Sequence, residues 1–154
     1  MTLSFSTQLN GKPTHFVDKI WQSLLRDNIE INAFEFNSKF KEVLPIIGGT
    51  KIGDFPQKKH TIREDKKNRW KADNYIHMVI YNRTPKRFQF TPVLKCVSTQ
   101  AIEIVYVDSD GCKLKTPTVY IDSVWITDIK QLAINDGFDT VDEFFAYFKT
   151  NYTG

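Results

Sequence analysis

The chain has 154 residues, of which 41% are hydrophobic and 25% are charged, and its formal net charge is +3. These proportions are typical of a soluble globular domain, and they exclude a disordered, collagen-like or coiled-coil chain. No run approaches the roughly 18 consecutive apolar residues that a membrane helix needs, and Cys96 and Cys112 are the only cysteines. We therefore expect one domain, residues 1–154, that is a cytoplasmic monomer or small oligomer without a membrane partner.

Basic residues are concentrated in the middle of the chain. Residues 58–95 contain eleven Lys or Arg against three acidic residues, a net charge of +8, whereas residues 96–154 have a net charge of −5. The densest stretch is 58–71, and a second cluster lies at 83–87. Such clustering is typical of a surface that binds nucleic acid or phosphate, although a single basic run can also be a solvated loop.

The first third of the chain predicts one strand and two helices. Residues 3–6 alternate between apolar and polar, which indicates a short strand. Apolar residues at helical spacing predict an amphipathic helix from His15 to about Arg26, and the same spacing returns at 36–44. Residues 45–57 hold three Gly and two Pro, which predicts an irregular, mobile loop that would act as a lid if it covers a site.

The middle of the chain predicts short strands, and its end predicts helices. The stretches that we expect to form strands are residues 60–63, 75–81, 88–97, 101–107 and 112–121. Pro92 should weaken the third of them. Asp128–Asp136 has the apolar spacing of a helix that ends at Gly137, and Thr140 begins a last helix with an aromatic face. Strands flanked by helices at both ends predict an α+β fold with a small barrel-like sheet.

Several kinds of site are missing from the sequence. The three histidines are scattered, and neither cysteine lies near one of them, so no zinc-binding spacing exists. The glycine-rich stretch 48–53 lacks the Gly-Lys-Ser/Thr ending of a phosphate-binding loop, and neither a Gly-x-Ser-x-Gly motif nor a dinucleotide fingerprint occurs. We therefore expect no metal and no cofactor.

Two stretches resemble the ASCH family. Lys58-Lys-His-Thr-Ile-Arg63, followed by Trp70-Lys-Ala-Asp-Asn74 and the predicted strand 75–81, is similar to the family's Lys-x-x-Thr-x-Arg segment and the barrel strand after it. Leu132–Phe144, with Asp-Gly-Phe at 136–138, is similar to the family's acidic residue, Gly-Phe pair and capped helix. The resemblance covers about residues 58–150. It implies a small PUA-like β-barrel with an inserted helix and loop at about 27–57.

The resemblance also implies a catalytic trio. In ASCH enzymes that remove the acetyl group from acetylated cytidine, the matching positions are Lys58, Thr61 and Asp136, with Thr61 as nucleophile, Lys58 as its base and the acid as proton carrier. Those enzymes have Glu where this chain has Asp136, and a loss of about 1 Å of reach can cost about 100-fold in rate. A regular strand would point Lys58 away from Thr61 and Arg63, so the trio requires a turn between them. Otherwise the three are ordinary strand, loop and helix-end residues.

Two hypotheses follow from charge and resemblance. The first is a module that binds RNA or a nucleotide or nucleoside in a basic cleft, and the second is an amidohydrolase acting on an acylated nucleoside. The first ranks higher because the charge asymmetry does not depend on the trio. The expected ligand-binding residues are Lys59, Arg63, Lys66, Lys67, Arg69, Trp70 and Arg83. Trp70 could stack on a base, but we favour a ring that plugs the barrel end.

Overall fold

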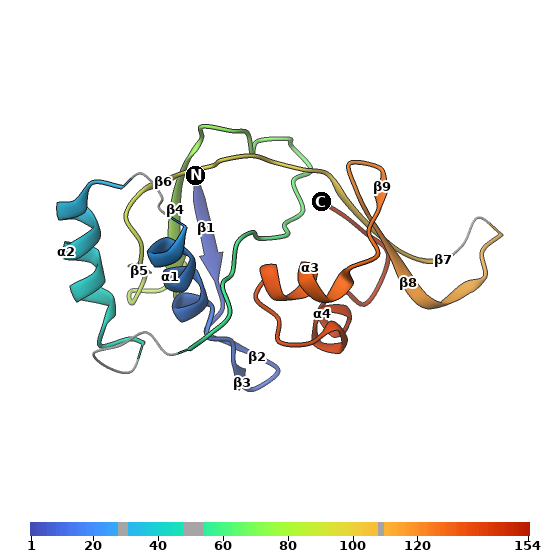
Figure 1. Cartoon of the computed structure of the whole chain (residues 1–154), viewed down its shortest axis with the longest axis horizontal. Coiled ribbons are helices and arrows are strands. Elements are labelled where there is room, and N and C mark those ends of the chain that lie inside the picture. Colours follow the sequence, from blue (N-terminus) through green and yellow to red (C-terminus); the bar gives the residue numbers. More distant parts are fainter. Residues whose placement is uncertain (28–30, 48–53, 108–109) are drawn as a thin grey trace.

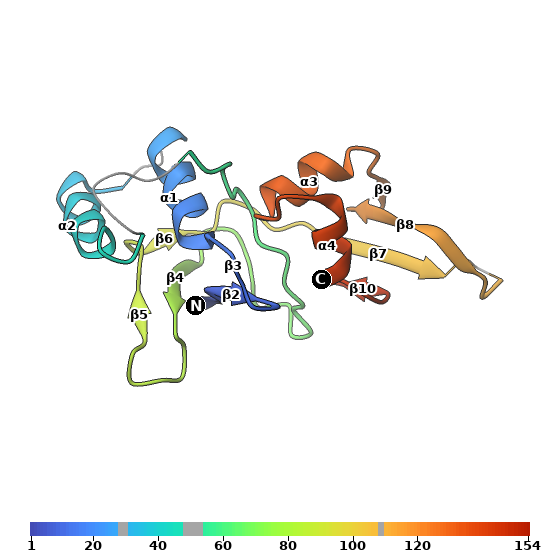
Figure 2. The ribbon, with the colours of Figure 1, turned by 90° about the horizontal axis from the view of Figure 1, so that it is seen from below.

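The protein consists of two lobes that lie side by side in a computed structural model, which describes residues 1–27, 31–47, 54–107 and 110–154 (Figures 1 and 2). The first lobe contains β1 (Thr2–Phe5), β2 (Gln8–Leu9), β3 (Lys12–Pro13), α1 (Phe16–Arg26), α2 (Ala33–Val43), β4 (Tyr75–Ile80), β5 (Phe88–Gln89) and β6 (Leu94–Lys95). The second contains β7 (Ile102–Val107), β8 (Lys113–Ile121), β9 (Val124–Trp125), α3 (Ile129–Asn135), α4 (Val141–Tyr147) and β10 (Tyr152–Thr153). Within the described part of the chain, every helix falls short of the length and apolar character needed to cross a bilayer.

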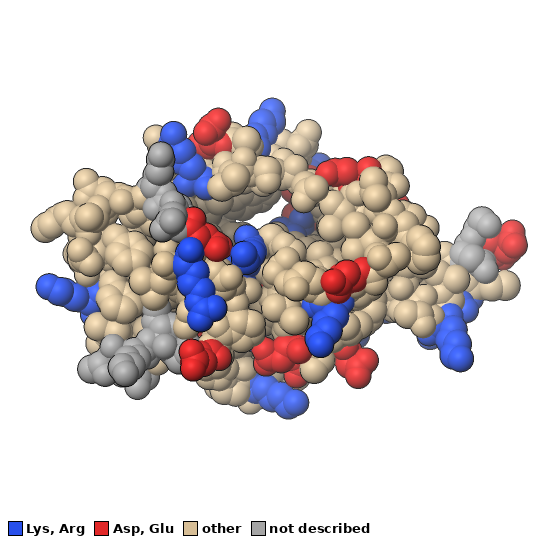
Figure 3. All heavy atoms as spheres, viewed as in Figure 1, with Lys and Arg blue, Asp and Glu red and all other residues tan. Residues whose placement is uncertain are grey.

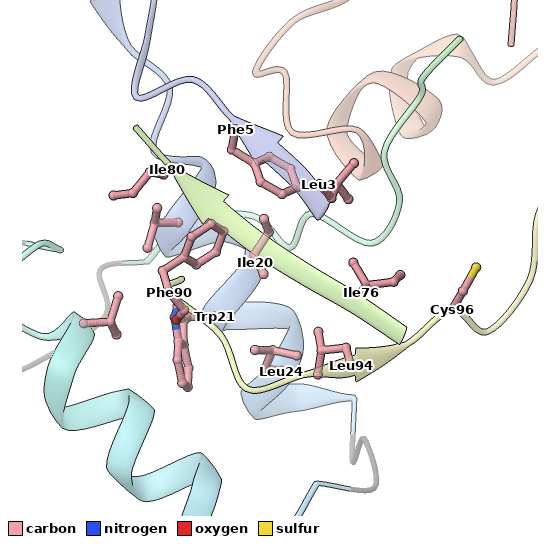
Figure 4. Close-up of a cluster of buried hydrophobic side chains, with 12 residues drawn as sticks. Leu3, Phe5, Ile20, Trp21, Leu24, Ile76, Ile80, Phe90, Leu94 and Cys96 are labelled. Carbon is pink, nitrogen blue, oxygen red and sulfur yellow. The ribbon is translucent and has the colours of Figure 1, made fainter. Parts of the chain in front are cut away.

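The first lobe is a small sheet covered by α1. Strand β4 is its centre, with β1 parallel to it and β5 and β6 antiparallel to it. The apolar face of α1 packs against this sheet, and the buried side chains of both elements form one core (Figure 4). Trp21 is fully buried there, and its indole N–H donates a hydrogen bond of 3.0 Å to the carbonyl oxygen of Phe90. The rings of Phe36 and Phe40, in the expected insertion, lie 5.2 and 5.3 Å from Trp21.

The second lobe is a sheet in the order β10-β7-β8-β9 with α3 and α4 packed against it. Its core is separate from that of the first lobe and is rich in phenylalanine, with Phe144 fully buried at its centre. Helix α3 ends as predicted at Gly137, whose φ is +95°. Helix α4 begins as predicted at Thr140, whose hydroxyl accepts a hydrogen bond of 3.1 Å from the Glu143 amide.

An extended segment, residues 54–74, runs between the two lobes (Figure 1, green), and we call it the connecting segment. The hydroxyl of Ser23 in α1 donates a hydrogen bond of 2.8 Å to the carbonyl of Lys58. The next amide, that of Lys59, donates one of 2.8 Å to the carbonyl of Asn135 in α3. The connecting segment therefore binds one lobe on each side.

The prediction of a PUA-like β-barrel is wrong. Within residues 1–27, 31–47, 54–107 and 110–154, the strands form two four-stranded sheets and the β2–β3 hairpin, and none of them closes on itself. Residues 60–63, which we expected to be a strand, are extended but belong to no sheet. Two of their amides donate to the end of α3 instead, His60 to the Asn135 carbonyl at 3.2 Å and Ile62 to the Asp136 carboxylate at 3.0 Å. Because these two amides are already bonded to α3, they are not available to pair with a neighbouring strand.

Most of the other predicted elements are confirmed. The helices at 16–26, 33–43, 129–135 and 141–147 and the strands β1, β4, β7 and β8 lie where the sequence places them. The predicted strand 88–97 is split into β5 and β6 around Pro92. Of the predicted lid, residues 48–53 lie outside the described residues.

Candidate functional site

A cavity of about 40 Å³ lies where the two lobes and the connecting segment meet, and we call it the central cavity. It is bounded by β1, the start of α1, the connecting segment, the end of α3 and the end of α4. Its walls are formed by Phe5, Ser6, Leu9, Phe16, Lys58, Thr61, Ile62, Arg63, Asp136, Phe138 and Tyr147. The three residues of the expected trio are therefore all part of one cavity.

Lys58 and Asp136 form a buried ion pair at this cavity. The Lys58 Nζ is 2.9 Å from Asp136 Oδ1, and the two side chains are only 3% and 6% exposed. The same ammonium also donates a hydrogen bond to the backbone carbonyl of Asp136 and lies 5.0 Å from the ring centre of Phe16. Asp136 Oδ1 in turn accepts from the Ile62 amide at 3.0 Å. Both charges are therefore paired and fixed in position, as buried charges must be.

Gly137 makes this pair possible. It is in the left-handed region, where a side chain is strained. A Cβ built on it would lie 2.9 Å from Lys58 Cδ and 2.9 Å from Phe16 Cε1. The glycine after α3 therefore both ends the helix and leaves room for the Lys58 stem.

The charge of Lys58 is disfavoured by its surroundings. Burial lowers the pKa of its ammonium, and the nearby cations Arg63 and Lys19 lower it further, while Asp136 acts in the opposite direction. The neighbouring Lys59 ammonium lies 3.6 Å from the carboxylate of Asp27. Lys58 is thus shifted in the direction that a general base requires.

Thr61 and Arg63 present polar groups without partners to the same cavity. Residues 58–63 do not form a regular strand, so Lys58 lines the cavity together with Thr61 and Arg63. Among the described residues, the Thr61 hydroxyl has no hydrogen bond. Arg63 donates through Nη2 to the Ser4 carbonyl at 2.5 Å, but its buried Nε has no partner. A buried donor without a partner, such as the Arg63 Nε, is rare in proteins, and a ligand or a water molecule often completes such a site.

The other expected ligand-binding residues do not line the central cavity. These are Lys59, Lys66, Lys67, Arg69, Trp70 and Arg83. The Lys66 ammonium lies 3.3 Å from Glu64, and Arg69 lies 3.8 Å from Asp65. Trp70 packs against the core of the first lobe. It does not plug a barrel end, as we had favoured, because the described sheets form no barrel. On the face shown in Figure 3, basic and acidic side chains are interspersed over both lobes.

Sequence reasoning missed the aromatic walls of the cavity. Phe5, Phe16, Phe138 and Tyr147 come from β1, α1, the turn after α3 and the end of α4. No local spacing links four residues that are so far apart in the chain. Only Phe138 was part of a motif, the Gly-Phe pair after the acidic residue.

In the part of the chain that the structure describes, no three His, Cys, Asp or Glu side chains are grouped so that they could hold a metal ion. No protein-family model, curated protein or solved structure matches this chain. The resemblance to the ASCH family therefore depends on the two motifs alone.

Proposed function

We propose that the protein binds RNA or a nucleotide-like ligand, with one polar edge of the ligand in the central cavity. The observation that carries this proposal is the pair of unpartnered groups, the Thr61 hydroxyl and the Arg63 Nε, beside the buried Lys58–Asp136 pair. A nucleobase combines a flat apolar face with an edge of hydrogen-bond donors and acceptors. The central cavity is complementary to such a base, because polar side chains on one wall can bond to the edge of the base while the aromatic rings around them can pack against its face.

The volume of the central cavity limits which part of a ligand enters it. A water needs about 10–15 Å³ of such space, so 40 Å³ corresponds to about three waters. An amino, carbonyl or acetyl group fits that volume, but a whole nucleoside does not. The rest of the ligand must therefore lie outside the central cavity.

The basic turn after the cavity supports the RNA form of this proposal. Lys66, Lys67 and Arg69 are exposed and follow Arg63 along the chain after two acidic residues. Glu64 and Asp65 offset part of their charge. A strand that places one base in the cavity would carry its neighbouring phosphates past this turn, in the cytoplasm where we expect the protein to act.

The test is titration of single-stranded RNA at several salt concentrations. We expect the affinity to fall steeply with salt, and the triple change of Lys66, Lys67 and Arg69 to Ala to reduce the log–log salt slope by about 2, at ~0.7 per lost phosphate contact. The matched control is the double change of Lys113 and Lys115 to Ala in β8, which should leave binding nearly unchanged. An affinity that is indifferent to salt and to the triple change would eliminate RNA as the ligand.

A second test separates the cavity from the turn. Thr61→Val keeps the size of the side chain and removes its hydroxyl, and we expect it to weaken binding about tenfold because the ligand's edge group loses a partner. Thr118→Val on β8 is the control for loss of a threonine hydroxyl on the protein surface. Equal affinities for Thr61→Val and Thr118→Val would place the ligand elsewhere.

The amidohydrolase remains a second candidate because the free Thr61 hydroxyl shares a cavity with Lys58, whose pKa is lowered by burial. In that reaction the Thr61 oxygen would attack the acyl carbon while the neutral form of Lys58 accepts the hydroxyl proton. The amide C–N bond would then break, with the amine of the nucleoside leaving with that proton, and a water molecule would hydrolyse the acyl ester on Thr61 to release the carboxylic acid. Thr61→Ala and Lys58→Ala should then abolish hydrolysis of acetylated cytidine, and Asp136→Glu should keep or increase it. If neither the parent protein nor Asp136→Glu hydrolyses this substrate while RNA or nucleotides bind, the site binds without cutting.

A further inference from the structure

A second and larger cavity adjoins the central one, and we call it the outer cavity. Its volume is about 330 Å³, which lies in the range of sites for small ligands. It is lined by Ile62, Arg63, Glu64, Tyr147, Phe148, Lys149, Thr150 and Tyr152. Ile62, Arg63 and Tyr147 belong to the walls of both cavities. A ligand whose edge group enters the central cavity would therefore extend directly into the outer one.

We propose that the outer cavity binds the sugar-phosphate part of the ligand, so that the protein recognises a nucleotide in preference to a free nucleoside. This inference rests on the proposed function, since the base edge is taken to occupy the central cavity. It assigns the phosphate to Arg63 and Lys149 and the sugar to the ring of Tyr147. None of the residues contributed by the C-terminal end, 147–152, was expected from the sequence to bind a ligand.

The charges at the outer cavity favour an anion. Within the described residues, the Lys149 ammonium is exposed and has neither a hydrogen bond nor an ion pair. Arg63, which lines both cavities, adds a second cation. The acid on this wall, Glu64, lies 3.3 Å from the ammonium of Lys66, which offsets its charge. A phosphate between Arg63 and Lys149 would satisfy two cations that are otherwise incompletely paired.

Neutral groups complete the wall. Burial and the nearby Glu64 carboxylate raise the pKa of Tyr152 to about 12, so its phenol stays protonated at neutral pH and can donate a hydrogen bond to an anion. Tyr147 is half exposed, and its ring is held by Phe138, whose ring centre is 5.5 Å away. A fixed and exposed ring between the two cavities is a suitable surface for a sugar or a base face.

The position of the outer cavity relative to α4 disfavours an anion. The outer cavity lies at the C-terminal end of α4, where the helix dipole is negative. The last carbonyls of that helix are partly screened, because the Tyr106 hydroxyl contacts the carbonyl oxygens of Phe145, at 3.3 Å, and Phe148. The remaining negative potential means that phosphate binding should depend strongly on the cations, and above all on Lys149.

The experiment is calorimetric titration of the full chain with the four ribonucleosides and with their 3′- and 5′-monophosphates. We expect at least one monophosphate to bind about tenfold or more tightly than its own nucleoside, as a charge-assisted contact provides. Lys149→Gln should remove that advantage and leave the affinity for the nucleoside unchanged. The matched control is Lys130→Gln, an exposed lysine on α3 that lines neither cavity.

The possible outcomes separate this inference from the proposed function. If nucleosides and monophosphates bind equally well and Lys149→Gln changes neither, the outer cavity is not a phosphate site, although nucleotide binding stands. If a monophosphate has an advantage that Lys149→Gln keeps, the phosphate lies elsewhere and the inference is wrong. If no nucleoside, monophosphate or RNA binds, the proposed function fails and this inference fails with it. A circular dichroism spectrum of each variant excludes unfolding as the cause.

Discussion

Replacing Lys58 by Met should destabilise the protein by about 3–5 kcal/mol. The side chain is 3% exposed, and Met keeps most of its apolar stem, so packing changes little. The change removes the partner of the Asp136 carboxylate, which is itself 6% exposed and retains only the Ile62 amide. Breaking one half of a buried ion pair typically costs about 3–5 kcal/mol. In a chain of this length that corresponds to a melting temperature lower by roughly 6–20 °C.

Urea denaturation of the parent protein and of four variants, Lys58→Met, Lys59→Met, Asp136→Asn and Lys58→Met/Asp136→Asn, tests this value. Lys59→Met is the matched control, since Lys59 is half exposed and its contact with Asp27 is 3.6 Å long, so its loss should cost less than about 1 kcal/mol. In the double variant Lys58→Met/Asp136→Asn no unpaired charge is left. It should therefore be more stable than the sum of its two single changes predicts, by about 2 kcal/mol or more. A cost for Lys58→Met equal to that of Lys59→Met, with additive changes in the double variant, would refute the buried pair.

We expect three further outcomes, two for residues of the Lys58–Asp136 site and one for the core of the first lobe. Gly137→Ala should lower the free energy of unfolding by about 2–4 kcal/mol, because it adds a methyl group 2.9 Å from two side-chain carbons at positive φ; Gly111→Ala, also at positive φ but with no atom within 4 Å, should cost only about 1 kcal/mol. Because the pKa of Lys58 is lowered, at a pH between its folded-state and unfolded-state pKa the unfolded chain holds a proton which the folded chain has released. Stability measured by urea titration should therefore rise with pH from the folded-state pKa of Lys58 up to about 10.4, and Lys58→Met should remove this rise. Trp21→Phe should cost about 1–3 kcal/mol in thermal unfolding, since it leaves a buried carbonyl without its donor; an unchanged melting temperature would argue against that hydrogen bond.

The sequence was sufficient for the elements but not for their assembly. Helix α1 could be predicted because its apolar residues recur at helical spacing, and α3 because Gly137 supplies the left-handed residue after it. The prediction of a barrel was wrong at residues 60–63, whose composition is typical of a strand but which belong to no sheet. Their backbone partners are Asn135 and Asp136, which are more than 70 positions away. These amides are thus bonded to a carbonyl and a carboxylate at the end of α3 and not to a neighbouring strand. No local sequence pattern indicates which of these acceptors an amide will choose.

Only some residues of the candidate site could be predicted from the sequence. Lys58, Thr61 and Asp136 could be named because they lie within two short motifs, and the structure brings all three to one cavity. Lys66, Lys67 and Arg69 were chosen by charge alone, and charge does not say which way an exposed side chain points. Tyr147 and Lys149 were missed because α4 reads as a core helix with an aromatic face. Its end reaches the site only through the packing of the second lobe.

The connecting segment has a consequence for how the molecule unfolds. The two hydrophobic cores are separate, and sheets that share no strand could in principle melt as independent cooperative units. Residues 58–63 help to couple them, because loss of order in either lobe removes hydrogen bonds that fix this segment against the other. Lys19 of α1 adds a direct link, since its ammonium donates to the Gly137 carbonyl at 2.8 Å and lies 2.5 Å from the Asp139 carboxylate. A single sigmoidal transition in the parent protein, and two transitions once Lys58 and Asp136 no longer attract each other, would show that this one buried contact is needed for the two lobes to unfold together.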